Sequence, residues 1–215
     1  MLIFMLEARP KKLMRVLGID LAGGESRTTG LCLLLVGGDS ERCVAEVLML
    51  KSMRTDAEIL DFVVTSRPKV IAVDAPLSFH GEPYRDCDVE LRKYCRLLPL
   101  TFYGMRVLAE RGIRLSDAMR ERTGAEIIEV YPYASARFLG INGVNDLKKF
   151  ISFEEEKVKN KHELDAALCG LTAAFYLKGK YKAFGKQDKL IVPFIGFLRD
   201  LLSPLKGGAS FSYHR

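Results

Sequence analysis

The sequence predicts an α/β domain built around a mixed β-sheet, and three features of the chain carry that prediction. Three apolar, strand-like segments follow one another near the start, with short Gly-containing turns between them. After them, segments with helical spacing alternate with further strand-like segments, as in sheets that are covered by helices. The last long helical segment is apolar along most of its length, which is typical of a helix packed on a sheet. With 215 residues, 48% of them hydrophobic, the chain can form one domain with a sizeable core.

The first three strands are expected to pair as antiparallel neighbours. They read "RVLGIDLA" (15–22), "TTGLCLLLV" (28–36) and "RCVAEVLML" (42–50). The turns between them, "GGESR" and "GGDSE", are short enough for hairpins. Because this patterned sequence begins near Met14, that residue is an alternative to Met1 as the true start of the chain.

Helices and strands then alternate. Residues 55–66 have apolar side chains at helical spacing and are followed by Pro68. "KVIAVDAP" (69–76) is apolar throughout, which indicates a strand buried on both faces. "AEIIEVYP" (125–132) is a further strand that ends in proline. A helical insertion at about 85–123 lies between these two strands.

The last third of the chain is expected to complete the domain. Residues 140–160 are charged and less regular, and a helix follows at 161–178. "KLIVPF" (189–194) is a short apolar segment, and residues 196–215 form an amphipathic C-terminal helix and tail. We therefore expect one domain over residues 14–195.

This order of elements is that of the ribonuclease H fold: a mixed five-stranded sheet, with three antiparallel hairpin strands plus two parallel strands, flanked by helices. Four stretches, "GIDLA", "VIAVDAPLSF", "IEVYPYASARFLG" and "KHELDAALCGLTAAFY", resemble the family called domain of unknown function 429. That family is described as predicted nucleases related to the RuvC resolvase branch of the ribonuclease H superfamily. The resemblance spans nearly the whole chain. It implies a ribonuclease H-like domain and, as an expectation, nuclease activity.

Two aspartates close strands that are otherwise apolar. Asp20 stands near the end of the first strand, and Asp74 ends another just before Pro76. An ionised carboxylate in a dry interior is costly unless it is paired or bound to a metal. Each residue also suits a turn, where Asp accepts hydrogen bonds from nearby backbone N–H groups. A ligand role and a capping role are therefore both open for these two residues.

The helix at 161–178 carries polar groups that its start does not require. Asn160 is the predicted N-cap, and Glu163 three residues later completes a motif like a capping box. Asp165 lies beyond the first turn, with His162 three residues earlier on the same side. The resemblance implies that Asp165 is the last acidic ligand, and that His162 stands where resolvases offer His or Asp. A solvated histidine at the helix start is the alternative for His162.

Carried over residue by residue, the resemblance implies a metal site made of Asp20, Asp74 and Asp165, with His162 beside it. Resolvases usually have Glu at the position of Asp74, so the shorter side chain can alter the metal spacing. Carboxylates from three elements at one sheet edge can hold two divalent ions about 4 Å apart. Because the ligands are hard oxygens, Mg²⁺ or Mn²⁺ is expected and zinc is not.

Other candidates lie outside this set. Glu129 in "IIEVYP" is a further catalytic candidate, and an ion pair with Arg137 or Lys161 is its structural alternative. Arg85 and Arg92 resemble the family's pattern after the Asp74 strand, so they are candidate substrate contacts at the mouth of the site. A helical surface with i,i+4 charge pairs explains the same arginines equally well.

The net charge of the chain limits which partners are expected, and its cysteines indicate the cellular compartment. A net charge of +6 favours polyanions such as nucleic acid. Lys180, Lys182 and Lys186 are candidate phosphate contacts, with solvated surface as their alternative. No apolar stretch is long enough to span a membrane. Five cysteines without a CxxC pair favour reduced thiols in a cytoplasmic protein.

The predicted function is that of a metal-dependent nuclease that hydrolyses phosphodiester bonds of DNA or RNA. The first alternative is a catalytically silent nucleic-acid-binding or regulatory protein of the same fold. The second is a phosphotransferase of the actin-like superfamily, because "GIDLAGGESRTTG" resembles the phosphate loop of sugar kinases. Those enzymes need two related domains and a DxGxT motif, which this sequence lacks. DNA, RNA and branched substrates all stay open, and a homodimer is one expectation, since resolvase relatives often act as dimers.

Overall fold

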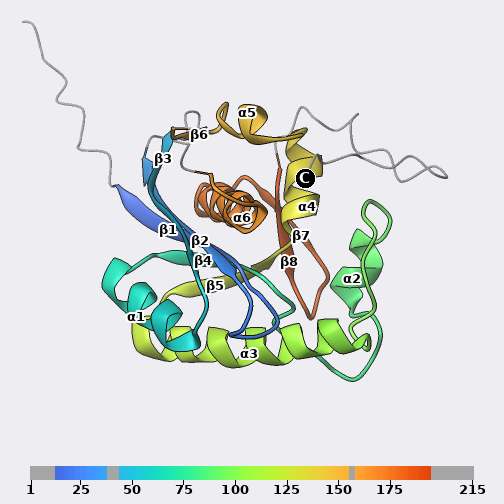
Figure 1. Cartoon of the computed structure of the whole chain (residues 1–215). Coiled ribbons are helices and arrows are strands. Elements are labelled where there is room, and N and C mark those ends of the chain that lie inside the picture. The colour runs from blue at the N-terminus through green and yellow to red at the C-terminus, as the bar shows by residue number, and fades with distance from the viewer. Residues whose placement is uncertain (1–12, 38–43, 155–157, 195–215) are drawn as a thin grey trace, which may run out of the picture.

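In the computed structural model, which describes residues 13–37, 44–154 and 158–194, one mixed β-sheet forms the centre of the molecule (Figure 1). The strands are β1 (Met14–Asp20), β2 (Thr29–Gly37), β3 (Val44–Met53), β4 (Val70–Asp74), β5 (Glu126–Val130), β6 (Ile151–Ser152), β7 (Tyr181–Phe184) and β8 (Leu190–Pro193). The helices are α1 (Asp56–Ser66), α2 (Asp86–Leu91), α3 (Tyr103–Thr123), α4 (Pro132–Leu139), α5 (Val144–Leu147) and α6 (Lys161–Leu177). The strand order is β6-β3-β2-β1-β4-β5-β8-β7.

The pairing of the strands confirms a mixed sheet. β1, β2 and β3 pair antiparallel in sequence, and β4 and β5 continue the sheet from β1 in parallel. The expected number of five strands is wrong, because the sheet has eight strands within the described residues. The segment at 189–194 contains β8, which pairs parallel with β5, and β7 pairs antiparallel with β8. The two-residue β6 extends the other edge beside β3.

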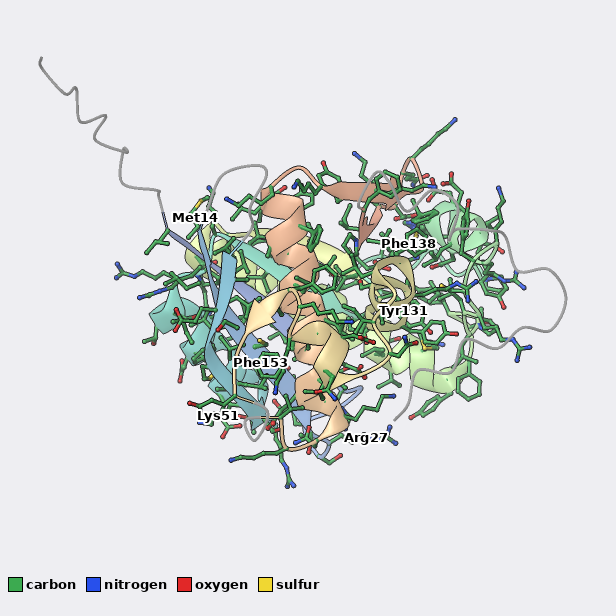
Figure 2. The ribbon with its side chains drawn as sticks, turned by 90° about the horizontal axis from the view of Figure 1, so that it is seen from above. Met14, Arg27, Lys51, Tyr131, Phe138 and Phe153 are labelled. Atoms are coloured by element: carbon green, nitrogen blue, oxygen red, sulfur yellow. The ribbon has the colours of Figure 1, made fainter. Side chains whose placement is uncertain are left out.

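Helices cover both faces of the sheet. Figure 1 shows α6 on one face and α1 with α3 on the other. Viewed from above, α6 crosses the middle of the sheet, with Phe138 of α4 beside it (Figure 2). Because successive side chains of a strand point to opposite faces of the sheet, the hydrophobic core has one part on each face. Val70 and Ala72 of β4 pack on the α6 side, whereas Ile71 and Val73 pack with α1 and α3.

Two glycines let α6 lie close against the sheet. A Cβ atom at Gly18 of β1 would overlap backbone atoms of Ala166 and Gly170 in α6. A Cβ atom at Gly30 of β2 would overlap the carbonyl oxygen of His162. The first turns of α6 therefore rest directly on the backbones of β1 and β2, near the end of β1 that carries Asp20.

The start of α6 is fastened by its own side chains and by β3. The N-cap at Asn160 is confirmed, since its side-chain oxygen accepts a hydrogen bond from the backbone N–H of Glu163 at 3.0 Å. The carboxylate of Glu163 accepts from the backbone N–H of Lys159 and from the hydroxyl of Ser52, each at 2.9 Å. Glu163 thus ties the helix start to the end of β3, which fixes where the residues that follow it point.

The segment expected to be a helical insertion at about 85–123 contains α2, α3 and the connection between them. Buried Arg111 anchors α3 to two loops of the sheet: its guanidinium donates to the Asp56 carboxylate, the Ala22 carbonyl and the Arg54 carbonyl. The described residues form one sheet, whereas the phosphotransferase alternative needs two related domains. The amphipathic segment at 196–215 lies outside the described residues, as do residues 1–12. None of the described helices has the length and apolar character that a membrane crossing requires.

Candidate active site

The parallel register of β1 and β4 brings two of the predicted residues together. Asp20 and Asp74 are the last residues of their strands and face each other as register partners. Two residues before Asp74, Ala72 packs on the α6 side of the sheet. Because side chains of a strand alternate between faces, Asp74 points to that side as well, toward the helix that carries Asp165.

Hydrogen bonds join these residues to the start of α6. The Nδ1 atom of His162 lies 2.7 Å from Oδ2 of Asp20, and the carboxyl group of Asp20 is also hydrogen-bonded to that of Asp74. Asp165 is buried, and its Oδ2 atom lies 3.7 Å from the ammonium group of Lys161. Asp20, Asp74 and His162 thus lie together at one end of β1 and β4, and Asp165 is near enough for its negative charge to raise the pKa of Asp74. We call these four residues the carboxylate cluster.

The protonation of the carboxylate cluster reflects its burial and its charge. Burial raises the pKa of Asp74 well above its usual range, and the negative charges of Asp20 and Asp165 raise it further. Burial also raises the pKa of Asp20, against the opposing effect of its hydrogen bond to His162. The charges of Asp20 and Asp165 thus disfavour the ionised form of Asp74, and three carboxyl groups are a donor set that fits a divalent cation.

Glu129 belongs to a different group of side chains. Ile127 of β5 packs with α3, and Glu129 two residues later shares that face, away from α6. Its carboxylate accepts hydrogen bonds from the guanidinium of Arg85 at 2.5 and 2.7 Å, and from the backbone N–H of Leu77 at 2.7 Å. The partner of Glu129 is therefore Arg85, and the backbone of the segment after β4 holds it as well.

Arg85 is buried, with 5% of its surface exposed, and its donors are occupied within the fold. Besides Glu129, it donates to both carboxylate oxygens of Asp88 at 3.0 Å and to the hydroxyl of Ser78 at 3.0 Å. Burial acts to lower the pKa of Arg85, but the two carboxylates outweigh that effect and raise it. Ligand atoms of Cys87, Asp88 and Glu129 lie within 4.8 Å of one another. Since Arg85 already provides the positive charge there, we assign this group to the structure of the fold and not to a metal.

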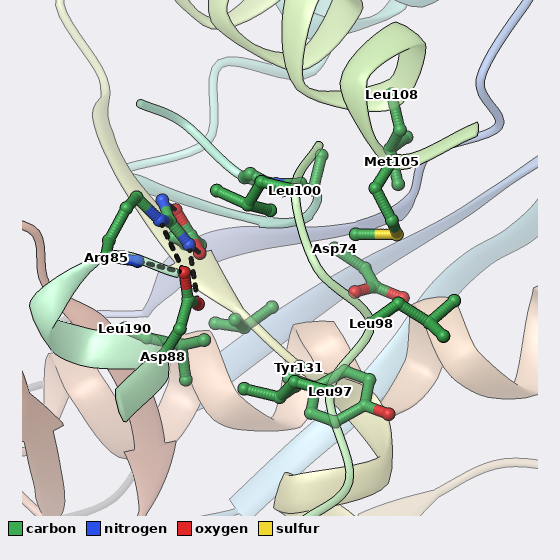
Figure 3. Close-up of a pocket in the computed structure, with 14 residues that line it drawn as sticks. Asp74, Arg85, Asp88, Leu97, Leu98, Leu100, Met105, Leu108, Tyr131 and Leu190 are labelled. Carbon is green, nitrogen blue, oxygen red and sulfur yellow. Dashed lines mark hydrogen bonds and ion pairs between the residues drawn. The ribbon is translucent and has the colours of Figure 1, made fainter. Parts of the chain in front are cut away.

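A cavity of about 220 Å³ lies beside Asp74 (Figure 3). Asp74 forms one end of it, next to Leu98 and Met105, and Arg85 with Asp88 forms the other end. The walls are mostly apolar and come from β4, β5, the α2–α3 connection and the start of α3. Sequence reasoning missed this cavity, because its lining comes from segments that are far apart along the chain and share no local pattern.

The other predicted substrate contacts lie outside the carboxylate cluster. The Arg92 guanidinium is exposed and lies over the ring of Tyr84, 4.0 Å from the ring centre. Lys182 is in β7, at the edge of the sheet, with β5 and β8 between β7 and β4. Lys180 immediately precedes β7, and Lys186 is in the turn that leads to β8. The three lysines thus form a basic edge beside the parallel strands, and their role in binding stays a prediction.

Comparisons with known proteins agree with this architecture. The sequence profile of the family described as "Protein of unknown function (DUF429)" matches residues 18–189. The structure of T. thermophilus RuvC in complex with Holliday junction substrate matches with a TM-score of 0.53 and 17% identity, over 77% of this chain and 96% of the RuvC chain. A second Thermus thermophilus RuvC structure matches with a TM-score of 0.50 and 17% identity, over 77% and 97%. A search of curated proteins gave no match. At this identity the similarity shows a shared fold, the mixed α/β fold of RuvC.

Proposed function

The chain belongs to the DUF429 family, and from this membership, its RuvC-like fold and its carboxylate cluster we propose that it is a metal-dependent nuclease that hydrolyses phosphodiester bonds of DNA or RNA. One observation carries the proposal: carboxylates from β1, β4 and α6, far apart in sequence, converge where two parallel strands end. Burial and the charges of its neighbours raise the pKa of Asp74 there, and this supports a site in which a bound cation would offset the negative charge.

Asp20, Asp74 and Asp165 would hold the metal, and Mg²⁺ or Mn²⁺ suits a set of oxygen ligands. When bound, such ions activate water and stabilise the charge that develops on the phosphate and on the leaving oxygen. The role of the protein is to fix the ligands in place. Gly18 and Gly30 allow the close approach of α6 that brings Asp165 and His162 to the strand ends.

His162 orients one ligand in this proposal. Its Nδ1 atom holds the Asp20 carboxylate in one orientation through the 2.7 Å hydrogen bond. About half of the side chain is exposed (49%), so the ring is also open to solvent and to a substrate that approaches the cluster. Lys161 is exposed beside Asp165 and is placed to contact a phosphate that approaches the cluster.

Nucleic acid is the proposed partner. The net charge of +6 favours it, and the T. thermophilus RuvC that shares this fold is seen with a Holliday junction. We further propose that residues 14–195 form a single domain, with Arg92, Lys180, Lys182 and Lys186 as phosphate contacts. A homodimer and a cytoplasmic location stay predictions of the resemblance, and light scattering of the purified protein would test the first of them.

The Asp165→Asn variant tests the proposal, because it keeps the shape of the side chain and removes one ligand charge. Wild type is expected to cleave labelled DNA or RNA in Mg²⁺ or Mn²⁺, and to gain about 2.7 kcal/mol of stability at an ion concentration 100 times Kd. The variant should lose both effects. Without metal it should be at least as stable as wild type, since one like charge is gone. Nuclease assays and calorimetry with and without Mn²⁺ measure these quantities.

Asp117→Asn in α3 is the matched control, because Asp117 is an exposed helical aspartate paired with Arg120. It should cleave and respond to Mn²⁺ as wild type does. If Asp165 has a purely structural role, Asp165→Asn would instead lose about 1–3 kcal/mol without metal and keep the Mn²⁺ response. That result would contradict the proposed nuclease. So would a wild-type protein that binds nucleic acid but cleaves none of the substrates, and either outcome would favour the catalytically silent binder.

A further inference from the structure

The cavity beside Asp74 is not needed to hold a metal, yet it shares a wall with the carboxylate cluster. Asp74 is a member of both. A phosphate group held at the cluster would therefore have the rest of its nucleotide within reach of the cavity. The position of the cavity thus makes it a place for part of the substrate.

The chemistry of the walls selects which part of a nucleotide can enter. Most of the lining is apolar: Leu97, Leu98, Leu100, Met105, Leu108 and Tyr131. The charged groups on the walls include three carboxylates, those of Asp74, Asp88 and Glu129. The guanidinium of Arg85 is engaged by the last two and by Ser78. Such walls disfavour an anionic phosphate and favour an uncharged ring with an apolar face.

The size of the cavity is consistent with one base. A volume of about 220 Å³ is below the roughly 300–1,000 Å³ that pockets for drug-sized ligands have. Met105 is unbranched and adaptable, and Tyr131 offers an aromatic ring, so the walls can fit different planar rings. The cavity therefore suits a small planar group such as a single nucleobase.

The α2–α3 connection, which contributes Leu97, Leu98 and Leu100 to the cavity, adds a second, independent observation. On the α2–α3 connection and the first residue of α3, Leu98, Phe102 and Tyr103 have exposed fractions of 60%, 58% and 81%. Exposed cations follow the same connection at Arg92, Lys93 and Arg96. Aromatic side chains interleaved with basic ones are typical of surfaces that bind unpaired strands, where bases stack and cations contact phosphates. Large exposed apolar side chains in a group also indicate a binding surface.

We propose that this cavity takes one unstacked nucleobase of the substrate, next to the phosphate at the carboxylate cluster. A base inside a duplex must leave its stack to enter such a cavity, and this costs least when the nucleotide is already unpaired. The protein therefore prefers DNA or RNA that contains an unpaired nucleotide. This inference rests on the proposed nuclease function and narrows its substrate class.

The test compares three fluorescent duplexes, made once in DNA and once in RNA: fully paired, with one unpaired adenine, and with an abasic residue in place of that adenine. Binding is measured with the Asp165→Asn variant, so that cleavage does not interfere. We expect the duplex with adenine to bind about 5-fold to 150-fold more tightly than the abasic one, as the removal of one stacked base predicts. Leu98→Gln at the exposed rim and Met105→Trp, which fills the cavity, should each remove most of this preference.

Leu48→Gln in β3 is the matched control, because Leu48 is an exposed leucine outside the cavity, and it should keep the preference. Equal binding of the adenine and abasic duplexes overturns the inference and leaves the nuclease proposal standing. A preference that survives both Leu98→Gln and Met105→Trp, in variants with unchanged circular dichroism, also overturns it. If no duplex binds, both proposals fail.

Discussion

Arg85 shows how one side chain sets the charge of the region beside the carboxylate cluster. Its guanidinium lies between the carboxylates of Asp88 and Glu129 in the interior. Burial raises the pKa of Glu129, and the contact with Arg85 opposes that rise. Without the arginine, two buried carboxylates would face each other close to Asp74. Arg85 thus supports the wall of the cavity and keeps the Glu129 carboxylate paired within the fold.

The substitution Arg85→Met is expected to lower the free energy of unfolding by about 3–5 kcal/mol, because it leaves two buried carboxylates without their partner. Denaturant unfolding followed by circular dichroism measures the change. Arg106→Met is the matched control, since Arg106 pairs with Glu110 on the surface and such pairs contribute about 0–1 kcal/mol. Equal effects of the two substitutions would show that the buried network adds no stability.

At the scale of elements, Asp86 joins α2 to the turn between β7 and β8. Its carboxylate accepts hydrogen bonds from the backbone N–H groups of Lys186, Gln187 and Asp188 at 2.5, 2.9 and 3.2 Å. Gly185, which begins this turn, has a φ of +84°, a conformation that glycine adopts without strain. The hydrogen bonds from Gln187 and Lys186 lead the effects that lower the pKa of Asp86 to about 2. The fold therefore favours the ionised form of Asp86.

The substitution Asp86→Asn tests this link, because Asn resembles the protonated acid. A lowered pKa in the folded state stabilises the fold above the ordinary value of 3.8, and the effect is lost as the pH falls through about 2. Wild type should therefore be more stable than the variant by a constant amount above about pH 5. The difference should shrink between about pH 4 and about pH 2. Urea unfolding of both proteins across this range measures it, and a difference that does not change with pH would contradict the prediction.

At the scale of the whole molecule, one group of basic residues lies at the edge of the sheet, apart from the carboxylate cluster. The basic edge formed by Lys180, Lys182 and Lys186 lies along β7 and its turn, beyond β5 and β8 from the carboxylate cluster. A strand or duplex that reaches from the cluster across the parallel strands would pass this edge. Phosphate contacts of this kind add affinity without reading sequence.

Replacing all three lysines with Gln should weaken binding to every nucleic-acid sequence alike. It should also reduce the slope of log K against log salt by roughly 0.9 for each phosphate of duplex DNA that the variant no longer neutralises. The matched control replaces Arg67, Lys69 and Arg122 with Gln. These residues lie near the starts of β4 and β5, at the end of the parallel strands opposite to the carboxylate cluster. Fluorescence anisotropy at several salt concentrations measures both slopes. The same slope in wild type and the triple lysine variant would make these lysines ordinary surface.

Local sequence determined most of the helices and strands, and it also supplied the residue types of the carboxylate cluster. Apolar periodicity predicts the first five strands and α6, because alternation and helical spacing are properties of neighbouring residues. The cap at Asn160 follows from residues within one turn. The two aspartates at the ends of apolar strands and Asp165 on an apolar helix are visible in the sequence as acidic residues in apolar surroundings. Their roles as metal ligands stay a prediction until the ion is bound and measured.

Only the tertiary structure decided which of these residues meet. The parallel register sets Asp20 opposite Asp74, and the close approach at Gly30 sets His162 beside Asp20. Contacts between segments far apart along the chain also decide the face to which Glu129 points and its pairing with Arg85. The additional strands and the cavity depend on such contacts as well. Local periodicity shows which side chains share a face of one strand, but packing and strand pairing choose which neighbour that face meets.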